Sequence, residues 1–238
     1  MTFSGQMKRK MNPFRFFAFL TIILSSCSGV ISVKMNGVAG VVQGITFAAD
    51  DGKIYVPLDE AEQRLNFRIA SPHKRKTSRK LTDGTPLISL EELVDGGIKV
   101  ARAEDGKSAS VSHFIHGFDM VVGAKRSEVD LAEQRLRAWQ GERLVMETHV
   151  SSGRNGRTPS GNFRAGPYKS RMHYSKLYDN APMPWSVQVN GNVFIHGFSS
   201  VPDYPASHGC IRVPLNEGNP ARFFYEWIDV GTPVRIRD

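Results

Sequence analysis

Residues 207–212 read Ser207-His208-Gly209-Cys210-Ile211-Arg212, and His196-Gly197 stands a short distance upstream, at the end of an apolar run. A thiol near pH 7 is only a few per cent thiolate, so a nucleophilic cysteine needs a neighbouring base or positive charge. The two histidines and the arginine around Cys210 can supply both. A glycine beside His196 and another beside Cys210 let the backbone approach a substrate closely and leave amides free to stabilise an oxyanion. The pattern therefore indicates a reactive thiol.

The sequence around this site predicts mostly short strands. Residues 142–151 alternate apolar and polar side chains, as a half-buried strand does. Asn190-Gly191, between two β-prone runs, predicts a type I′ hairpin. Asn219 and Pro220 are typical of a helix start, here for a helix through Ile228 that is followed by a last strand at 234–236. Residues 128–139 fit both strand and helix spacing, so the expected domain is mainly β with one packed carboxy-terminal helix.

The His196-Gly197 and SHGCIR segments together resemble the signature of the L,D-transpeptidase catalytic domain family. Residues 158–163, Thr-Pro-Ser-Gly-Asn-Phe, are similar to that family's upstream turn, and residues 230–234 also fit. The resemblance covers residues 119–238. It implies an L,D-transpeptidase-like β-sandwich and a cysteine acyltransferase of peptidoglycan. The enzyme would form a thioester on the third residue of a stem peptide, release D-alanine and pass the acyl group to an amine.

The resemblance also implies a role for each residue of the motif. Cys210 would be the nucleophile, and His196 would be the general base, oriented by the backbone carbonyl of Gly197. His208 would bind substrate or the developing oxyanion, together with the amides of Gly209 and Cys210.

Four further residues are expected to bind the stem peptide. Ser207 and Arg212 belong to the motif itself, and the charge of Arg212 suits an anionic peptide. Tyr174 and Trp185 belong to an aromatic stretch, residues 166–185, that forms either a lid over the substrate or an irregular hydrophobic surface loop. Carbapenem-type compounds are expected inhibitors.

The amino terminus has the features of an export signal. A basic segment at 7–11 precedes an apolar run at 16–24, which as a helix would rise roughly 14 Å and so is too short to cross a bilayer. Leu24-Ser25-Ser26-Cys27 then resembles a bacterial lipobox, whose cysteine carries the lipid. Residues 1–27 are therefore interpreted as a lipoprotein signal peptide, with an ordinary signal peptide as the alternative. The protein is expected in the periplasm or cell envelope, held to a membrane by lipid on Cys27.

Residues 31–112 contain a weak internal repeat. The segments that begin at Asp51-Gly52 and at Asp83-Gly84 each read as a turn, a short strand and a helical stretch, with further β-prone runs at 67–69 and 98–100. This pattern resembles the small α+β module at the amino terminus of copper amine oxidases. Residues 107–118 are expected to bridge to the catalytic domain, whose first strand would be 120–122.

Several classes of partner are excluded or disfavoured. The net charge of +8 comes largely from the signal peptide and a basic run at 73–80. That run is expected to be a solvated loop, or to touch anionic wall polymers. An exported protein without a nucleic-acid motif is not expected to bind nucleic acid. No cofactor or metal is expected, because His113 and His116 lack a third ligand and the spacing of the histidines around Cys210 makes tetrahedral ligation awkward.

Three alternative functions remain open on the sequence. Water in place of the amine acceptor would give an L,D-carboxypeptidase or another wall hydrolase that uses the same cysteine. Other cysteine peptidases fit the order and spacing of histidine, cysteine and arginine less well. A noncatalytic wall-binding lipoprotein would not need the intact thiol and both histidines.

Overall fold

The computed structural model describes residues 40–69, 79–216 and 218–238. The predicted signal peptide, the lipobox cysteine Cys27 and most of the basic run at 73–80 lie outside the described residues. No helix in the described ranges is long and apolar enough to span a membrane.

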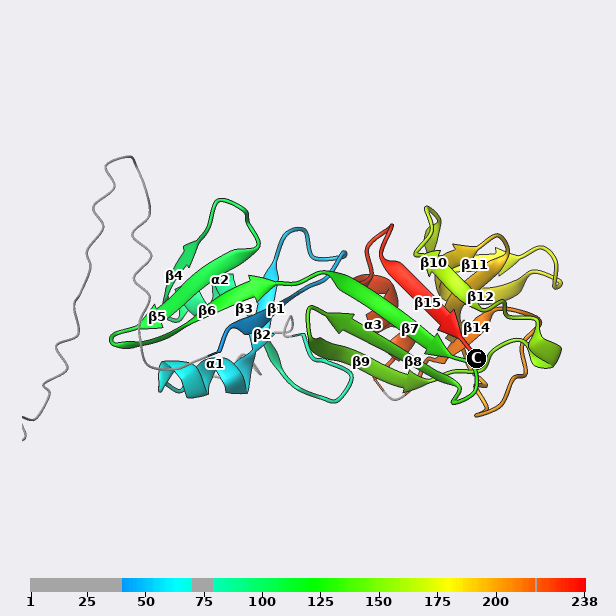
Figure 1. Cartoon of the computed structure of the whole chain (residues 1–238), viewed down its shortest axis with the longest axis horizontal. Helices are drawn as coiled ribbons and strands as arrows, with labels where there is room; N and C mark the ends of the chain where they lie inside the picture. Colours follow the sequence, from blue (N-terminus) through cyan, green and yellow to red (C-terminus); the bar gives the residue numbers. More distant parts are fainter. Residues whose placement is uncertain (1–39, 70–78, 217) are drawn as a thin grey trace, which may run out of the picture. The chain divides into compact units, whose positions relative to one another are not determined.

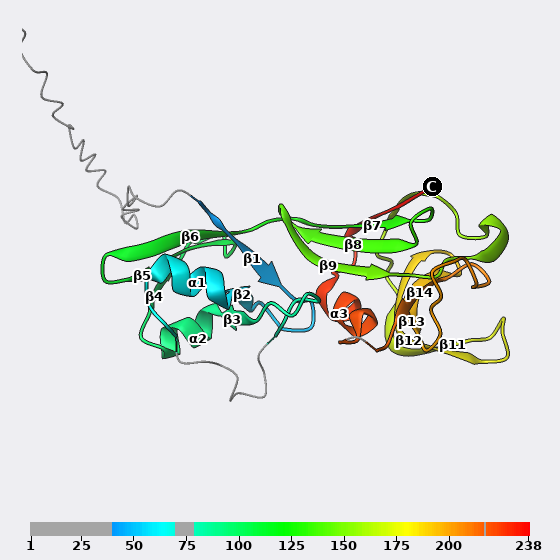
Figure 2. The ribbon, with the colours of Figure 1, turned by 90° about the horizontal axis from the view of Figure 1, so that it is seen from below.

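The amino-terminal module is built on a six-stranded sheet of order β3-β2-β1-β6-β5-β4 (Figure 1). Its strands are β1 (Val42–Thr46), β2 (Ile54–Pro57), β3 (Leu87–Ser89), β4 (Lys99–Arg102), β5 (Ser108–His113) and β6 (His116–Val122). Two helices, α1 (Leu58–Leu65) and α2 (Leu90–Asp95), cover one face of this sheet (Figure 2). The strand–helix part of the predicted repeat is therefore present, since β2 leads into α1 and β3 into α2.

Local sequence explains these two helices. The hydroxyl of Ser89 accepts from the Glu92 amide while the Glu92 carboxylate accepts from the Ser89 amide, which forms a capping box at the start of α2. Leu58 and Leu65 of α1 and Leu93 of α2 are buried against the sheet. The β-prone run at 98–100 lies within β4 or just before it, whereas the prediction of a strand at 67–69 was wrong.

The segment expected to bridge the two domains is instead part of this sheet. Residues 107–118 form most of the β5–β6 hairpin, and the strand expected at 120–122 is the end of β6, which pairs in parallel with β1. The cause is non-local, because β1 lies more than seventy residues before β6 in the chain and no local pattern shows that pairing. The strands of the carboxy-terminal domain therefore begin after Val122.

Two further sheets make up the rest of the chain, in the orders β10-β15-β7-β8-β9 and β11-β12-β13-β14. Their strands are β7 (Lys125–Asp130), β8 (Arg135–Gln140), β9 (Arg143–His149), β10 (Gly161–Arg164), β11 (Lys169–Ser175), β12 (Ala181–Asn190), β13 (Val193–Phe198), β14 (Ile211–Pro214) and β15 (Pro233–Arg237). A short 3₁₀ turn, η2 (Arg154–Gly156), precedes β10. The ambiguous residues 128–139 are the end of β7, a turn and most of β8. The expectation of a mainly β domain is confirmed.

Helix α3 (Pro220–Trp227) is the packed carboxy-terminal helix that the sequence predicted. The side chain of Asn219 accepts a hydrogen bond of 3.0 Å from the Arg222 amide, and Pro220 occupies the first helical position. Phe224 and Trp227 are fully buried.

The β12–β13 hairpin is also present, but its turn differs from the prediction. Asn190 pairs with Val193, so the turn residues are Gly191 and Asn192, and a register shift lies between Gln188 and Asn190. Gly191 has φ +49°, whereas Asn190 and Asn192 do not have positive φ. A type I′ turn needs positive φ at both central residues. The turn is therefore not type I′.

The module and the carboxy-terminal domain share one hydrophobic core. Ile45 and Phe47 of the module are buried in the same cluster as Phe224 and Trp227, and the rings of Phe47 and Phe223 meet edge to face at 5.4 Å. The buried amide of Gln140 joins both parts: it accepts from the Thr46 amide at 3.0 Å and from the Trp227 indole at 3.3 Å, and it donates to the Thr46 hydroxyl at 2.9 Å.

One residue of the basic run, Arg79, differs from the expectation of a solvated loop. The guanidinium of Arg79 is three-quarters buried, forms a bidentate ion pair with Asp50 at 2.7 and 2.8 Å, and pairs with Glu226 of α3. Burial lowers the pKa of Arg79, and the two carboxylates raise it. The net effect is a rise. Arg79 therefore ties the module to α3. Lys80 is exposed, as expected.

We expect Gln140→Ala to lower the free energy of unfolding by about 2–4 kcal/mol, because the indole N–H of Trp227 and the amide of Thr46 lose their acceptor. Denaturant unfolding measures this change. Gln63→Ala, at an exposed position of α1, is the matched control and should change stability by less than about 0.5 kcal/mol. Equal effects of the two substitutions would contradict the role given to Gln140.

Candidate active site

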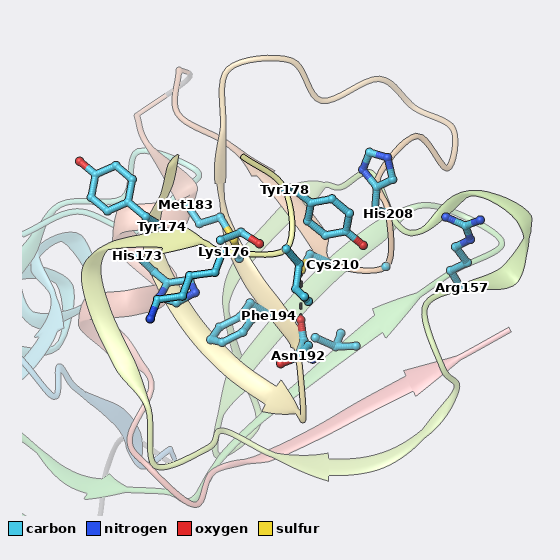
Figure 3. A pocket seen from close by; sticks show the side chains of 14 residues that line it. Arg157, His173, Tyr174, Lys176, Tyr178, Met183, Asn192, Phe194, His208 and Cys210 are labelled. Atoms are coloured by element: carbon cyan, nitrogen blue, oxygen red, sulfur yellow. Dashed lines mark hydrogen bonds between the residues drawn. The ribbon is translucent and has the colours of Figure 1, made fainter. Parts of the chain in front are cut away.

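Cys210 lies in a cavity of about 350 Å³ between the β11–β12 hairpin and the loop that precedes β14 (Figure 3). The cavity is lined by Arg157, residues 173–178, Met183, residues 192–194 and residues 208–210. Of the predicted site residues, Tyr174, His208, Gly209 and Cys210 are in this lining.

The thiol of Cys210 is partly exposed and unpaired with any other described cysteine. Its Sγ lies 3.5 Å from the carbonyl oxygen of Asn192, to which it donates. Burial raises the pKa of the thiol above its ordinary value, while the backbone amide of Phe194 and the charge of Arg212 act in the opposite direction. The thiol is therefore protonated at neutral pH in the unliganded site and needs a base to react.

His196 is placed beside Cys210 by parallel pairing of β13 and β14. Ile195 is level with Ile211, and His196 is level with Arg212. Continuing this register by one residue puts Cys210 level with Phe194, and the contacts of its Sγ with the backbone of Asn192 and Phe194 agree. Because side chains alternate along a strand, Cys210 and His196 belong to the same face of the sheet. The thiol and the imidazole are therefore diagonal neighbours on this face of the sheet.

The imidazole of His196 is held in one orientation. Its Nδ1 lies 2.9 Å from the carbonyl oxygen of Gly197, which is the partner that the sequence resemblance implied. With Nδ1–H as the donor, Nε2 keeps its lone pair. Burial lowers the pKa of His196 to about 4, the hydrogen bond to Gly197 opposes this, and the charge of Arg212 adds to it. His196 is therefore neutral at pH 7 and able to accept a proton.

Gly197 is required for a different reason from the one the sequence suggested. A Cβ at this position would lie 2.4 Å from Leu215 Cδ2 and 3.2 Å from the Cβ of Ala221. The bare Cα thus permits β13 to pack closely against α3 and does not face the cavity. That this glycine also lets the backbone approach a substrate stays a prediction.

The loop carrying Cys210 is held by its own serine. Ser207 is buried, and its hydroxyl donates to the Cys210 carbonyl at 2.5 Å and accepts from the Gly209 amide at 3.0 Å. The Gly209 amide is therefore engaged, contrary to the prediction that it is free for an oxyanion. Ser207 itself orders the loop and does not line the cavity.

The sequence did not indicate Thr158 as a site residue, although its turn belongs to the family pattern. Its buried hydroxyl accepts from the Gly153 amide at 2.7 Å and donates to the Gly209 carbonyl at 2.8 Å. Gly209 has φ +148°, which favours glycine, and a Cβ on Gly153 would lie 2.8 Å from the Cα of Gly209. One hydroxyl therefore joins the upstream turn to the loop that presents the thiol.

His208 and Tyr178 form one wall of the cavity. His208 is exposed and stacks on the ring of Tyr178, with centroids 4.5 Å apart and planes 24° apart (Figure 3). Desolvation and the charges of Arg154, Arg157 and Arg212 lower the pKa of His208. A neutral, stacked imidazole at the rim is suited to contact a ligand.

Of the remaining predicted binding residues, Tyr174 lines the cavity, whereas Trp185 and Arg212 do not. Tyr174 is exposed at the cavity, as part of the β11–β12 hairpin that the sequence interpreted as either a lid or a surface loop. Trp185 lies outside the cavity lining and packs against Tyr225 and Arg222 on α3. The guanidinium of Arg212 lies 4.1 Å above the ring of Phe198. Arg212 therefore acts on Cys210 through its charge and does not line the cavity.

Some lining residues had no signal in the sequence. Asn192 and Phe194 reach the thiol through their backbone atoms, which no residue type encodes. Arg157 and Lys176 lie on loops far apart in the sequence and become neighbours of the cavity only in the fold. Within the described residues, no group of three potential metal ligands occurs.

Replacing Thr158 tests the hydroxyl bridge. We expect Thr158→Val, which keeps the shape but removes the hydroxyl, to lower the free energy of unfolding by about 1–3 kcal/mol, because the Gly153 amide and Gly209 carbonyl lose their partner. It should also change the rate at which Cys210 is alkylated, followed by mass spectrometry of its peptide. Thr158→Ser retains the hydroxyl and should restore the alkylation rate. If Thr158→Ser changes the alkylation rate as much as Thr158→Val does, packing and not the hydroxyl holds the loop.

The buried imidazole predicts a pH dependence of stability. Since the pKa of His196 is about 4 in the folded protein and about 6.5 when unfolded, the unfolded chain binds the extra proton, and stability falls as the pH drops from 6.5 towards 4. Between pH 7.5 and 4.5 we expect the wild type to lose about 2–3 kcal/mol more than His196→Gln, which lacks this titration. Denaturant unfolding at both pH values provides the comparison, and parallel pH profiles would contradict the burial argument.

The sequence also matches a known family. Residues 124–236 match the family model YkuD, the L,D-transpeptidase catalytic domain. No curated protein matches the chain significantly.

Among solved structures, the chain is similar to an L,D-transpeptidase from Stackebrandtia nassauensis, with 26% identity over 48% of this chain and 56% of that one and a TM-score of 0.43. It is similar to residues 123–326 of an L,D-transpeptidase from Xylanimonas cellulosilytica, with 31% identity over 49% and 61% of the two chains and a TM-score of 0.42. An L,D-transpeptidase from Mycobacterium smegmatis shares 18% identity over 83% and 95% of the chains, with a TM-score of 0.44. The chain thus spans less than two thirds of the length of the first two. Residues 124–236 of this chain are therefore similar to the L,D-transpeptidase catalytic domain family.

Proposed function

We propose that this protein is an exported L,D-transpeptidase that remodels peptidoglycan through Cys210. One observation carries this proposal: a partly exposed thiol in a cavity lies next to the strand that bears a buried, neutral histidine. Both residues lie in the segment that matches the L,D-transpeptidase catalytic domain model. A buried ring that is neutral at pH 7 can take the thiol proton, which a protonated ring cannot.

The proposed reaction has two steps. In the first, Nε2 of His196 accepts the Cys210 proton as Sγ attacks the carbonyl of the third stem residue. The amide bond to D-alanine breaks, His196 returns the proton to the leaving amine, and a thioester remains on Cys210. In the second step an amine of another stem attacks the thioester carbonyl and the C–S bond breaks. His196 takes the proton of the amine and returns it to the departing sulfur, which gives a 3→3 crosslink and regenerates the thiol.

The oxyanion of each tetrahedral intermediate needs donors near Sγ. The Gly209 amide is bound to Ser207, so the role falls to the Cys210 amide and to His208 at the rim. Ser207 and Thr158 contribute by fixing the loop that carries these donors.

The charge of the cavity suits an acidic peptide. Arg157 and Lys176 are exposed on its lining, His208 stands at its edge, and Arg212 lies behind Cys210. Stem peptides carry free carboxylates, which such cations attract. Tyr174 and Tyr178 add aromatic surface on the hairpin side for the apolar parts of the donor.

Two parts of the proposal rest on the sequence alone. Cys27, in the lipobox, is proposed to carry lipid and so to hold the enzyme at a membrane of the cell envelope. The amino-terminal module, with its resemblance to that of copper amine oxidases, is proposed as a platform that supports the catalytic domain. One structure similar to this chain is an L,D-transpeptidase in complex with imipenem, which supports carbapenems as inhibitors here.

Incubation with purified disaccharide tetrapeptides tests the reaction, with products followed by mass spectrometry. We expect loss of D-alanine and formation of 3→3 dimers, and at least about 10³-fold less product with Cys210→Ala, because the nucleophile is absent. Tripeptide monomers without dimers would show that water is the acceptor and that the enzyme is a carboxypeptidase.

Incubation with a carbapenem provides the control that the thiol itself reacts. One acyl adduct is expected on the wild type and on Cys27→Ala, and none on Cys210→Ala. Product formation or acylation that persists in Cys210→Ala would refute the assignment. Unchanged activity in the presence of a chelator would separate thiol chemistry from a zinc site.

A further inference from the structure

The tip of the β5–β6 hairpin carries two bulky apolar residues in solvent. Phe114 is 89% exposed and Ile115 is 79% exposed. His113 pairs with His116, so these two residues alone form the turn that joins the strands, at one end of the six-stranded sheet (Figure 1). Soluble proteins rarely present adjacent large apolar side chains in this way without a partner.

The turn itself does not require these residues. Two-residue hairpin turns favour asparagine, aspartate and glycine. Phe114 has φ +52°, a left-handed conformation that is unfavourable for a bulky side chain. The sequence therefore carries an unfavourable residue at the tip, and such local strain is typical of functional positions.

The tip is supported from beneath. The ring of His113 packs against those of Phe67 at 4.2 Å and Phe114 at 4.5 Å, and the side chain of Asn66 lies 3.5 Å from His116 Nε2. Residues 66 and 67 directly follow α1, so the hairpin end is braced on a helix end. The apolar side chains project from a firm base.

Two exposed cations lie close to the tip in the chain or in the sheet. Arg68 follows Phe67 and is exposed, and Lys99 of β4 is exposed and pairs with Ser112, next to His113. An apolar tip with cations near its base suits an anionic lipid surface, where the apolar side chains enter the headgroup region and the cations meet phosphates.

The strand register relates this tip to the amino-terminal segment. β1 runs parallel to β6, with Val42 level with Met120, so Gly40 is level with Phe118. Since β6 starts at the tip, the chain enters β1 from the tip side of the sheet. Cys27 precedes Gly40 by 13 residues, a span of at most about 45 Å. A lipid on Cys27 can therefore reach the bilayer that the tip would touch.

We propose that Phe114 and Ile115 insert into the bilayer that holds the lipid of Cys27, with Arg68 and Lys99 on its anionic headgroups. This inference rests on the lipidation included in the proposed function. It makes the module a second membrane contact, which fixes the orientation of the enzyme at the surface.

The test uses the processed, lipidated protein in vesicles of phosphatidylethanolamine and phosphatidylglycerol whose acyl chains are brominated. Phe114→Trp adds a fluorophore at the tip, and the emission of the three native tryptophans is subtracted with the wild type. We expect the added emission to shift to the blue and to fall at least two-fold relative to unbrominated vesicles. Val230→Trp, at an apolar residue that is 59% exposed outside the module, is the matched control and should not be quenched.

Quenching of Phe114→Trp no stronger than that of Val230→Trp would overturn the inference. The mass of the peptide that begins at Cys27 shows lipidation separately, so an unquenched tip on a lipidated chain refutes only the insertion. Sedimentation in detergent tests the alternative that a second copy of the chain covers the tip. A dimer of the wild type that is lost in the Phe114→Ser/Ile115→Ser variant would assign the tip to a second copy of the chain and would also overturn the inference.

Discussion

The parallel pairing of β13 and β14 is the constraint on which the rest of the site depends. Parallel strands cannot be joined by a tight turn, so the chain needs a long connection between Phe198 and Ile211. The end of that connection is Ser207 to Cys210. The register that sets Ile195 level with Ile211 then brings the thiol and the imidazole of His196 together on one face. A shift of one residue would turn His196 to the opposite face.

Burial disfavours the charged form of both Cys210 and His196. It raises the pKa of Cys210 and lowers that of His196, so the resting pair is neutral. Formation of a thiolate and an imidazolium is strongly uphill in the unliganded site, even with the help of Arg212. Proton transfer is therefore expected to accompany attack on the carbonyl, when the developing oxyanion gains its donors. A resting thiol of this kind is also protected from oxidation, which requires thiolate character.

The sequence predicted those parts of the protein that depend on neighbours in the chain. The capped start of α3, the β12–β13 hairpin and the strand–helix repeat follow from local residue types, and the bond from His196 to the carbonyl of Gly197 followed from the family pattern. The failures are non-local. The β1–β6 pairing moved residues 107–122 into the amino-terminal sheet, and Arg79 meets Glu226 across 147 residues. Packing against α3, invisible in the sequence, decided the role of Gly197 and placed Trp185 outside the cavity.

Helix α3 connects these observations. On one side, Phe223 of the helix packs against Phe47 of the module, and Glu226 of the helix forms an ion pair with Arg79. On the other side, Ala221 packs on the bare Cα of Gly197, whose carbonyl orients His196. Interiors are close-packed, so a displaced helix would move the strand beneath it. The module is therefore more than a spacer. Its contacts stabilise the position of α3, and the position of α3 in turn determines the position of His196, the proposed catalytic base.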